Sequence, residues 1–389
     1  MRPIAILIAL LAAFSAAQAA PVEQGPKNVP EFRPAFQGQT RAPEDRSGVH
    51  LKTEVFVDGL SHPWGIAPLP GGGYLVTERP GRLRVIGADG ALSAPIDGLP
   101  RVFARRQGGL LDVAVGPSFA QDRVIYFTYA KPMGGGRSAT AAARAVLSPD
   151  GRELSRVRDI FVQTPPSPTP AHYGSRILFD GAGHAFITTG EHFTQAERQK
   201  AQDTGIPYGK VIRVALDGGI PADNPFGNAV WSYGHRNIQG AAIRPGTGQL
   251  WTVEHGPRGG DELNRIEPGR NYGWPVISYG ENYDGSPVGQ GLTTAEGMEQ
   301  PVYYWDPVIA PGGMQFYDGT RFGAWRGDLL IASLTPGGLV RLSLENGRVT
   351  GEERFLRGTR LRDVQVAPDG SVLVLVDAEP GGILRLTPE

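Results

Sequence analysis

Residues 64–86, WGIAPLPGGGYLVTERPGRLRVI, contain three short apolar runs separated by turns of Gly, Pro and charged residues. The runs are Trp64–Ala67, Gly73–Val76 and Leu83–Ile86. Apolar runs of this length, bounded by Gly and Pro, predict β-strands. The third run also places Arg84 beside aliphatic residues. The stretch therefore predicts a small sheet of consecutive antiparallel strands.

The same unit recurs along the chain, with further repeats beginning near Asp112, Arg176, Gly240, Gly313 and Asp363. Their two inner strands are predicted at 112–115 with 124–129, 177–179 with 185–189, 241–244 with 250–254, 314–317 with 329–332, and 364–367 with 372–376. Outer strands are predicted at 211–216, 339–344 and 383–386. The starts of neighbouring repeats are separated by unequal lengths of chain, as expected where long loops are inserted between strands.

Six such repeats predict an all-β fold, a six-bladed β-propeller of four-stranded antiparallel blades, spanning residues 51–389. A pair of β-sandwiches or a solenoid is the alternative, but a solenoid requires more even spacing. The 389 residues include 55 Gly and 34 Pro, a composition that suits many short strands. A formal net charge of -1 is not the strong positive charge that is typical of nucleic-acid-binding proteins. The absence of cysteine excludes disulfides and thiolate metal ligands.

The first 19 residues predict a secretory signal peptide. Arg2 precedes an apolar run from Ile4 to Phe14, and Ala17-Gln18-Ala19 fits the small-residue cleavage rule. A membrane anchor is the alternative, but the run is too short to cross a bilayer, and no later segment is long enough either. Residues 20–50, polar and rich in proline, are interpreted as an extended arm. The mature protein is expected to be periplasmic or secreted, without a membrane span.

A histidine and a carboxylate lie near the ends of neighbouring strands in the third repeat. His172 follows the proline-rich stretch 164–170, and Glu191 follows the strand at 185–189. Antiparallel strands can bring the two together, so that a carboxylate orients a histidine suited to general-base work. A hydrogen-bonded loop histidine is the simpler alternative. Gln107, before Gly108-Gly109, can offer an amide to a ligand or can be solvated in a turn.

Two pairs of polar residues could bind an anionic or carbonyl group. Arg236-Asn237 gives adjacent cationic and amide donors at a strand entry, although the two could equally satisfy backbone carbonyls. Arg360 and Arg362 are two residues apart and would share a face of an extended chain, which suits carboxylate recognition. Two solvated surface arginines are the alternative there.

Residues 254–264, EHGPRGGDELN, together with 271–275, NYGWP, form the densest polar segment. Carboxylates, amides and carbonyls shaped by Gly and Pro are the hard oxygen ligands that calcium prefers. The spacing is not that of an EF-hand, and a structural acid cluster explains the composition equally well. The sequence thus leaves a calcium site open.

In their order on six repeats, these motifs resemble the soluble PQQ-dependent aldose/glucose dehydrogenase family, whose members are six-bladed propeller quinoproteins using pyrroloquinoline quinone (PQQ) and calcium. The resemblance covers the chain from about residue 60 to the C-terminus. Its most specific strings are His62-Pro63-Trp64, Gln107 to Asp112, Tyr233 to Asn237, Glu254 to Glu262, and Asn271 to Pro275.

The resemblance implies a role for each matching residue. His172 matches the base that removes the proton of the anomeric hydroxyl, Glu191 its acidic partner, and Arg236 a group that stabilises the developing oxyanion. The cofactor-contacting positions are matched by Gln107, His172, Arg236, Asn237, Tyr283, Arg360 and Arg362. The carbonyls of Gly256 and Pro257 match ligands of the calcium that holds PQQ, and the Glu262 side chain and the Tyr272 carbonyl match a second calcium site.

One position departs from the family pattern. Where some members place a lysine that contacts PQQ, this chain has Thr335, which can donate a hydrogen bond but carries no charge. Weaker binding of the cofactor or compensation by a nearby arginine would follow.

The resemblance implies oxidation of an aldose to a lactone, with electrons passed to an external acceptor that is a quinone or cytochrome-like, by a monomer or homodimer. Two other functions remain to be separated from it. A calcium-dependent propeller hydrolase of lactones or esters would need no PQQ, and a non-catalytic binding propeller would need neither His172 nor Arg236.

Overall fold

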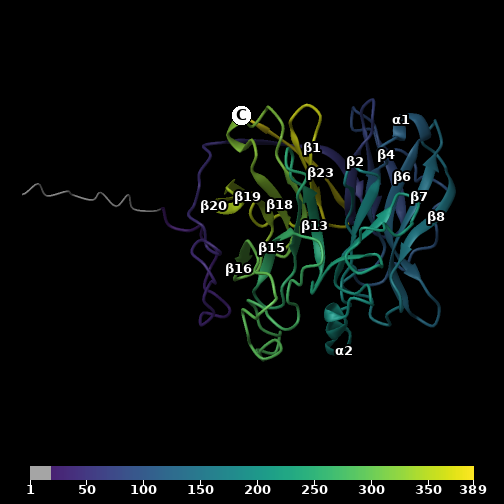
Figure 1. Cartoon of the computed structure of the whole chain (residues 1–389). Coiled ribbons are helices and arrows are strands. Elements are labelled where there is room, and N and C mark those ends of the chain that lie inside the picture. Colours follow the sequence, from purple (N-terminus) through teal and green to yellow (C-terminus); the bar gives the residue numbers. More distant parts are fainter. Residues whose placement is uncertain (1–18) are drawn as a thin grey trace, which may run out of the picture.

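A computed structural model describes residues 19–389, and they form six antiparallel sheets arranged in a ring (Figure 1). The predicted six-bladed β-propeller is confirmed. The predicted signal peptide, residues 1–19, lies outside the described residues except for Ala19. Every inner strand predicted from the repeats is present within a few residues of its predicted bounds.

The blades follow one another along the chain. Blade 1 contains β2 (Pro63–Pro68), β3 (Tyr74–Glu78) and β4 (Arg82–Ile86). Blade 2 contains β5 (Leu110–Val115), β6 (Val124–Pro132), β7 (Ser138–Leu147) and β8 (Leu154–Val162). Blade 3 contains β9 (Ile177–Phe179), β10 (His184–Thr188), β11 (Lys210–Ala215) and β12 (Val230–Tyr233). Blade 4 contains β13 (Ile238–Ile243), β14 (Leu250–Glu254), β15 (Asp261–Ile266) and β16 (Tyr303–Trp305). Blade 5 contains β17 (Pro311–Phe316), β18 (Leu329–Ser333), β19 (Gly338–Glu345) and β20 (Arg348–Phe355). Short helices lie between strands: α1 (Phe119–Asp122), α2 (Gln195–Arg198), η1 (Gln199–Gln202) and η2 (Gly323–Trp325).

Blade 6 closes the ring with strands from both ends of the propeller. β21 (Leu361–Val366), β22 (Val372–Val376) and β23 (Gly381–Pro388) pair in order, and β1 (Leu51–Leu60) adds the outermost strand against β23. In blade 1 the fourth position is taken by an irregular segment, in which Ser93 and Ile96 donate backbone hydrogen bonds to β4. The sequence repeats did not reveal that β1 belongs to the last blade.

Each blade packs between two others, so its central strands are buried on both faces. Every residue of β14 is accordingly buried, and β22 is apolar along its whole length. The main hydrophobic clusters each join neighbouring blades, such as Leu75 of blade 1 with Phe127 of blade 2. A ring of blades held by such contacts is a rigid support for the loops at its two ends.

The arm at residues 19–50 lies along the outside of the ring, past β16 and β20 (Figure 1). The carboxylate of Asp306 accepts hydrogen bonds from the amides of Asn28 and Val29 at 2.8 and 3.0 Å. Arg41 donates to the carbonyl of Asp306 at 2.9 Å, and Glu44 forms a β-bridge with Glu352. The arm is therefore fastened to blades 4 and 5 by its own polar groups.

Residues that follow one another along an inner strand also follow one another along the central channel of the propeller. Trp64, His172, Gln239 and Arg362 line a cavity at one end, and Ile66, Ile177, Ala241 and Val364 line a funnel at the other. Between them lies one ring of six residues at or next to the starts of the repeats: Gly65, Asp112, Arg176, Gly240, Gly313 and Asp363.

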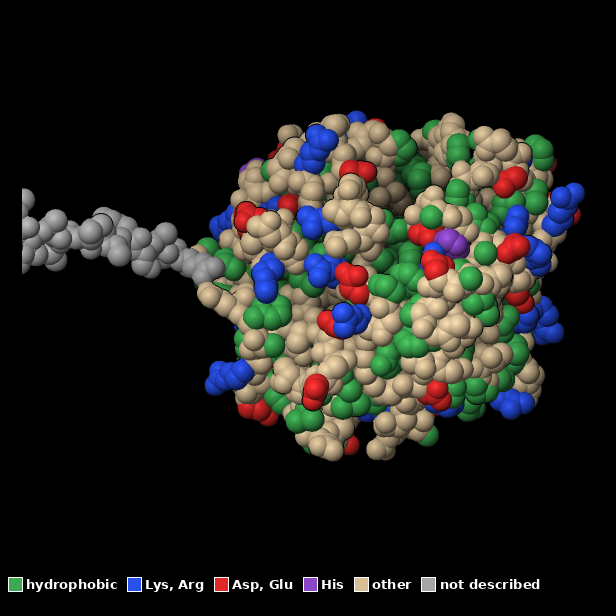
Figure 2. Space-filling model, in the orientation of Figure 1, with side chains coloured by type: hydrophobic (Ala, Val, Ile, Leu, Met, Phe, Trp, Pro, Cys, Tyr) green, Lys and Arg blue, Asp and Glu red, His purple; other side chains and the backbone are tan. Residues whose placement is uncertain are grey.

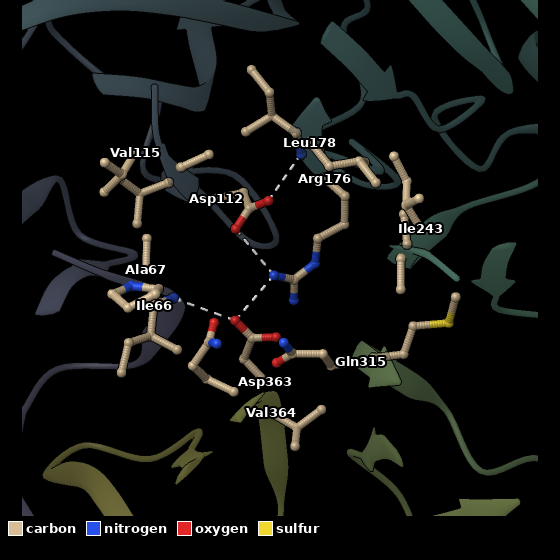
Figure 3. A pocket seen from close by; sticks show the side chains of 18 of the residues that line it. Ile66, Ala67, Asp112, Val115, Arg176, Leu178, Ile243, Gln315, Asp363 and Val364 are labelled. Carbon is tan, nitrogen blue, oxygen red and sulfur yellow. Dashed lines mark hydrogen bonds and ion pairs between the residues drawn. The ribbon is translucent and has the colours of Figure 1, made fainter. Parts of the chain in front are cut away.

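Three positions of this ring carry charge. Arg176 bonds Asp112 and Asp363, each at 3.1 Å (Figure 3), and the three side chains are buried. The other three positions are glycines, and a Cβ at Gly313 would lie 1.6 Å from Asp363 Oδ1. The glycines thus make room for these three charged side chains, which lie between the cavity and the funnel.

The face shown in Figure 2 carries Lys and Arg side chains interspersed with Asp and Glu. Within residues 19–389, no helix is both long and apolar enough to span a membrane.

Candidate functional site

Seven of the predicted site residues converge on a cavity of about 160 Å³ at one end of the channel. Gln107, His172, Arg236, Asn237, Tyr283, Arg360 and Arg362 all line it. They come from loops and strand starts of blades 2, 3, 4 and 6, with Tyr283 from the long loop between β15 and β16. This loop and α2 project from the same end of the ring (bottom of Figure 1), where Arg198 bonds Asn282 at 2.8 Å.

The His172 and Glu191 side chains meet as the strand geometry predicted. His172 Nδ1 lies 3.1 Å from Glu191 Oε1, and both side chains are buried. The second carboxylate oxygen of Glu191 accepts a hydrogen bond from the Phe193 amide. Since Nδ1 faces a carboxylate, it carries the proton, and Nε2 is left with a lone pair.

The loop that carries His172 is held in an unusual backbone conformation. His172 has φ of 48°, in the left-handed region that non-glycine residues rarely occupy. Gln107 Oε1 accepts from the His172 amide at 2.8 Å, and Asn237 Oδ1 accepts from the Gly174 amide at 3.0 Å. A Cβ at Gly190 would lie 2.0 Å from the His172 carbonyl oxygen, so only glycine permits this approach. Strain maintained by this many contacts is typical of functional sites.

The electrostatics of this pair suit a base. Burial lowers the pKa of His172 below its ordinary value, the positive charge of Arg236 lowers it further, and Glu191 opposes both. For Glu191, burial raises the pKa, but His172 and Arg236 outweigh it and the net shift is downward. His172 is therefore neutral and Glu191 ionised near neutral pH, the protonation states that proton abstraction requires.

Arginines dominate the rest of the cavity wall. Arg236 Nη1 donates to the carbonyls of His255 and Gly256 at 2.9 and 2.7 Å. Arg360 and Arg362 share one carboxylate oxygen of Asp377, at 3.1 and 2.7 Å. Burial alone would raise the pKa of Asp377, but Arg362 and its other partners depress it strongly. Asp377 thus orients both arginines while cancelling part of their charge.

Several buried donors at the cavity lack a partner among the described residues. They are the Nε–H groups of Arg236 and Arg362, and the ring nitrogen Nε2 of His255 is also unpaired among those residues. Buried donors of this kind are normally satisfied by a ligand or by water. Together with a surplus of guanidinium groups, they fit an anionic ligand that carries carboxylates, as PQQ does.

Two of the predicted cofactor positions lie at the edge of the cavity. Tyr283 is 64% exposed, and its ring lies 6.2 Å from that of Phe193. Thr335 is not part of the lining, and its Oγ1 accepts from Arg360 Nη1 at 3.4 Å. Thr335 therefore contributes to the site through Arg360.

The predicted ligands of the first calcium are backbone carbonyls beside the cavity. The Gly256 carbonyl accepts from Arg236 and so faces the cavity wall, with Pro257 next to it in the chain. Within residues 19–389, no group of three or more His, Cys, Asp or Glu side chains is placed to hold a metal ion. A site built mainly from carbonyls would not form such a group, so the donor chemistry fits calcium without a side-chain cluster.

The second predicted calcium position has an excess of buried negative charge. Glu262 lies opposite Glu254 in the β14–β15 ladder, and Asn264 donates to both carboxylates at 3.2 Å. Burial, and then the Glu254 charge, raise the pKa of Glu262 well above its usual value. Two neighbouring buried carboxylates would be stabilised by a bound cation. The Tyr272 ring stacks on His235, which bonds Glu254.

Sequence reasoning missed several cavity residues: Trp64, Arg79, Gln239, His255 and Leu334. It also missed Asp377, which orients the arginines. One signal was available, because Glu78, Glu191, Glu254 and Asp377 all stand at or just after the end of the second strand of their blades. Each of these carboxylates bonds an Arg or His side chain.

A family model described as Glucose / Sorbosone dehydrogenase matches residues 60–385. The chain belongs to this family. Among its relatives is Aldose sugar dehydrogenase YliI of Escherichia coli, 42% identical over 87% of this chain and 93% of the relative. Quinoprotein glucose dehydrogenase B of Acinetobacter calcoaceticus is 26% identical over 85% of this chain and 86% of its own length.

Solved structures agree with this membership. The apo-form of the soluble aldose sugar dehydrogenase from Escherichia coli superposes with a TM-score of 0.84 at 42% identity, covering 87% of this chain and all of that one. The PQQ-bound aldose sugar dehydrogenase from Streptomyces coelicolor gives 0.72 at 29% identity, covering 88% of this chain and 99% of that one. Family membership confirms the prediction of a sugar dehydrogenase type of enzyme.

Proposed function

We propose that this family member oxidises aldose sugars at the anomeric carbon to lactones, with PQQ and calcium bound at the cavity and His172 as the base. The observation that carries the proposal is the buried His172–Glu191 pair facing a wall of arginines and unpaired donors. A Streptomyces coelicolor relative has been solved with PQQ bound, which supports the choice of cofactor.

His172 would act through Nε2. The Glu191 carboxylate holds the proton on Nδ1, so the Nε2 lone pair is free to accept the proton of the anomeric hydroxyl. The imidazolium that forms is stabilised by the Glu191 charge. Gln107 and Asn237 hold the loop backbone, which fixes where Nε2 lies relative to the cavity.

Arg236, Arg360 and Arg362, with Gln107, Asn237 and Tyr283, would hold PQQ, and the carbonyls of Gly256 and Pro257 would hold calcium. When bound, PQQ accepts hydride from the sugar carbon, and calcium acts as a Lewis acid on the quinone. Arg236 places positive charge on the cavity wall where negative charge develops. Glu262 and Tyr272 would contribute to a second, structural calcium site.

The electrons would leave to an external acceptor, a quinone or a cytochrome-like protein. We propose that the enzyme is exported, because the first 19 residues have the features of a signal peptide. N-terminal sequencing of the protein purified from its native host checks this, since the mature chain should begin at Ala20.

The direct test is reconstitution. Protein free of cofactor, mixed with PQQ and Ca²⁺, should reduce a redox dye when an aldose is added, and omission of PQQ should abolish the reaction. Bound PQQ without dye reduction across a broad panel of aldoses would contradict the sugar assignment. Hydrolysis of lactones by the PQQ-free protein would favour the hydrolase instead, and failure to bind PQQ at micromolar concentration would favour a binding propeller.

A further inference from the structure

Arg79 follows β3 and lines the cavity together with Trp64, Gln107, Arg360 and Arg362. It is half-buried, and no family motif used in the sequence analysis includes it. Its guanidinium forms no hydrogen bond or ion pair with any other residue in the part of the chain that the structure describes. The other three arginines of the lining are each held by carbonyls or by Asp377.

The backbone of Arg79 is fixed, although its guanidinium has no partner among the described residues. Its amide donates to the His62 carbonyl, and its carbonyl accepts from the Leu110 amide, both at 3.1 Å. A Cβ at Gly109 would lie 2.0 Å from the Arg79 carbonyl oxygen and 2.6 Å from its Cγ. The Gly108-Gly109 turn therefore leaves space through which the Arg79 side chain reaches the cavity. An ordered backbone at the base of the side chain reduces the entropy lost when the guanidinium binds a ligand.

The positive charges around Arg79 would be stabilised by a bound anion. Burial, above all, lowers the pKa of Arg362, and Arg79 and Arg360 add to this by repulsion although Asp377 opposes it. Asp377 is shared by Arg360 and Arg362 and leaves Arg79 uncompensated. Thr335 adds no charge and lies outside the lining. A carboxylate placed among these guanidinium groups would relieve the repulsion.

We propose that Arg79 binds a carboxylate of PQQ and supplies the positive charge that Thr335 does not provide. This inference rests on the proposed function, because it requires PQQ in the cavity. The bond is a charge-assisted one between a guanidinium and a carboxylate, the type that contributes most to affinity.

The experiment measures the Kd of PQQ for the cofactor-free protein in the presence of Ca²⁺, by calorimetry or by quenching of tryptophan fluorescence. Arg79→Gln should weaken binding by about tenfold to a hundredfold, and Arg79→Lys by less, because the charge is kept. Arg137→Gln, at an exposed position outside the cavity, is the matched control and should bind as the wild type does.

A second variant restores a positive charge at another position, and so separates an effect on PQQ binding from an effect on folding. Thr335→Lys added to Arg79→Gln should recover part of the lost affinity, with an unchanged unfolding midpoint for all variants. If the wild type binds PQQ and Arg79→Gln binds it equally well, the inference is overturned and the proposed function stands. If the wild type binds no PQQ, the proposed function fails and the inference fails with it.

Discussion

The cavity and the neighbouring ring of residues lie at the starts of the same inner strands, with loop residues added in the cavity, but their charges are balanced differently. In the ring, Arg176 lies between Asp112 and Asp363, and none of the three side chains is more than 8% exposed. In the cavity, only Arg360 and Arg362 of the four arginines bond a carboxylate, Asp377, and several buried nitrogens have no partner among the described residues. Trp64 lies between the two regions, with the Arg176 guanidinium 4.4 Å from its ring and that of Arg362 5.8 Å away.

The difference shows how to separate a structural charge cluster from a binding site. Buried charges that satisfy one another hold the fold, because each would be costly alone. Buried charges with a surplus of one sign require a partner from outside. Gln239 connects the regions, with its carbonyl accepting from Arg176 and its side chain from Arg362. Variants in the ring should therefore alter stability, and variants in the cavity should alter binding and turnover.

The largest effect is expected for Arg176→Met. It leaves Asp112 and Asp363 buried without a counter-charge, and should lower the free energy of unfolding by about 3–5 kcal/mol. Urea denaturation followed by fluorescence measures it, with Arg137→Met as the exposed control. If the folded variant also lost PQQ affinity to the extent expected for Arg79→Gln, ring and cavity would have to be regarded as one site.

His172→Gln tests the other side of the comparison. The amide of residue 172 still donates to Gln107, so the loop should keep its shape, but no base remains at Nε2. Turnover with saturating aldose should fall by on the order of a hundredfold or more, while the Kd of PQQ and the unfolding midpoint change little. His50→Gln, at an exposed position, is the control. Turnover near the wild-type rate would reject His172 as the base.

The strands and the His172–Glu191 contact could be predicted because they depend on local patterns. Apolar runs bounded by Gly and Pro locate β3 and β14, and antiparallel neighbours bring together residues at their ends. Gln107 and Arg236 lie in family motifs, Arg362 was singled out by its spacing from Arg360, and the structure places all three on one cavity.

What could not be predicted depends on closure of the ring. β1 pairs with β23 across more than 300 residues, and no periodicity marks that contact. Arg176 meets Asp112 and Asp363 only because the six repeat starts converge on one axis. Arg79 and Asp377 occupy ordinary turns in the sequence and acquire their surroundings from other blades.

Gly313→Ala gives a smaller effect confined to the ring. A Cβ there would lie 1.6 Å from Asp363 Oδ1 and 2.7 Å from Arg176 Nη2, so the charged groups must move apart. We expect destabilisation by about 1–3 kcal/mol from overpacking. Gly323→Ala is the matched control, because no atom lies within 4 Å of its added Cβ. Equal unfolding midpoints for the two variants would mean that the ring tolerates displacement and does not hold the blades together.

The smallest effect concerns the acid limb of the pH profile. Neutral His172 is the active form of the base, so activity falls as the pH drops through its pKa, which burial and Arg236 place below the ordinary imidazole value. Glu191 opposes that shift, and Glu191→Gln should therefore lower the pKa further and move the acid limb of kcat/KM by roughly one unit toward lower pH. The maximum rate should fall as well, because the imidazolium loses its counter-charge. NMR titration of the His172 ring in the cofactor-free protein measures the same shift independently of turnover. A limb that stays in place or moves toward higher pH would show that Glu191 does not act on the base through its charge.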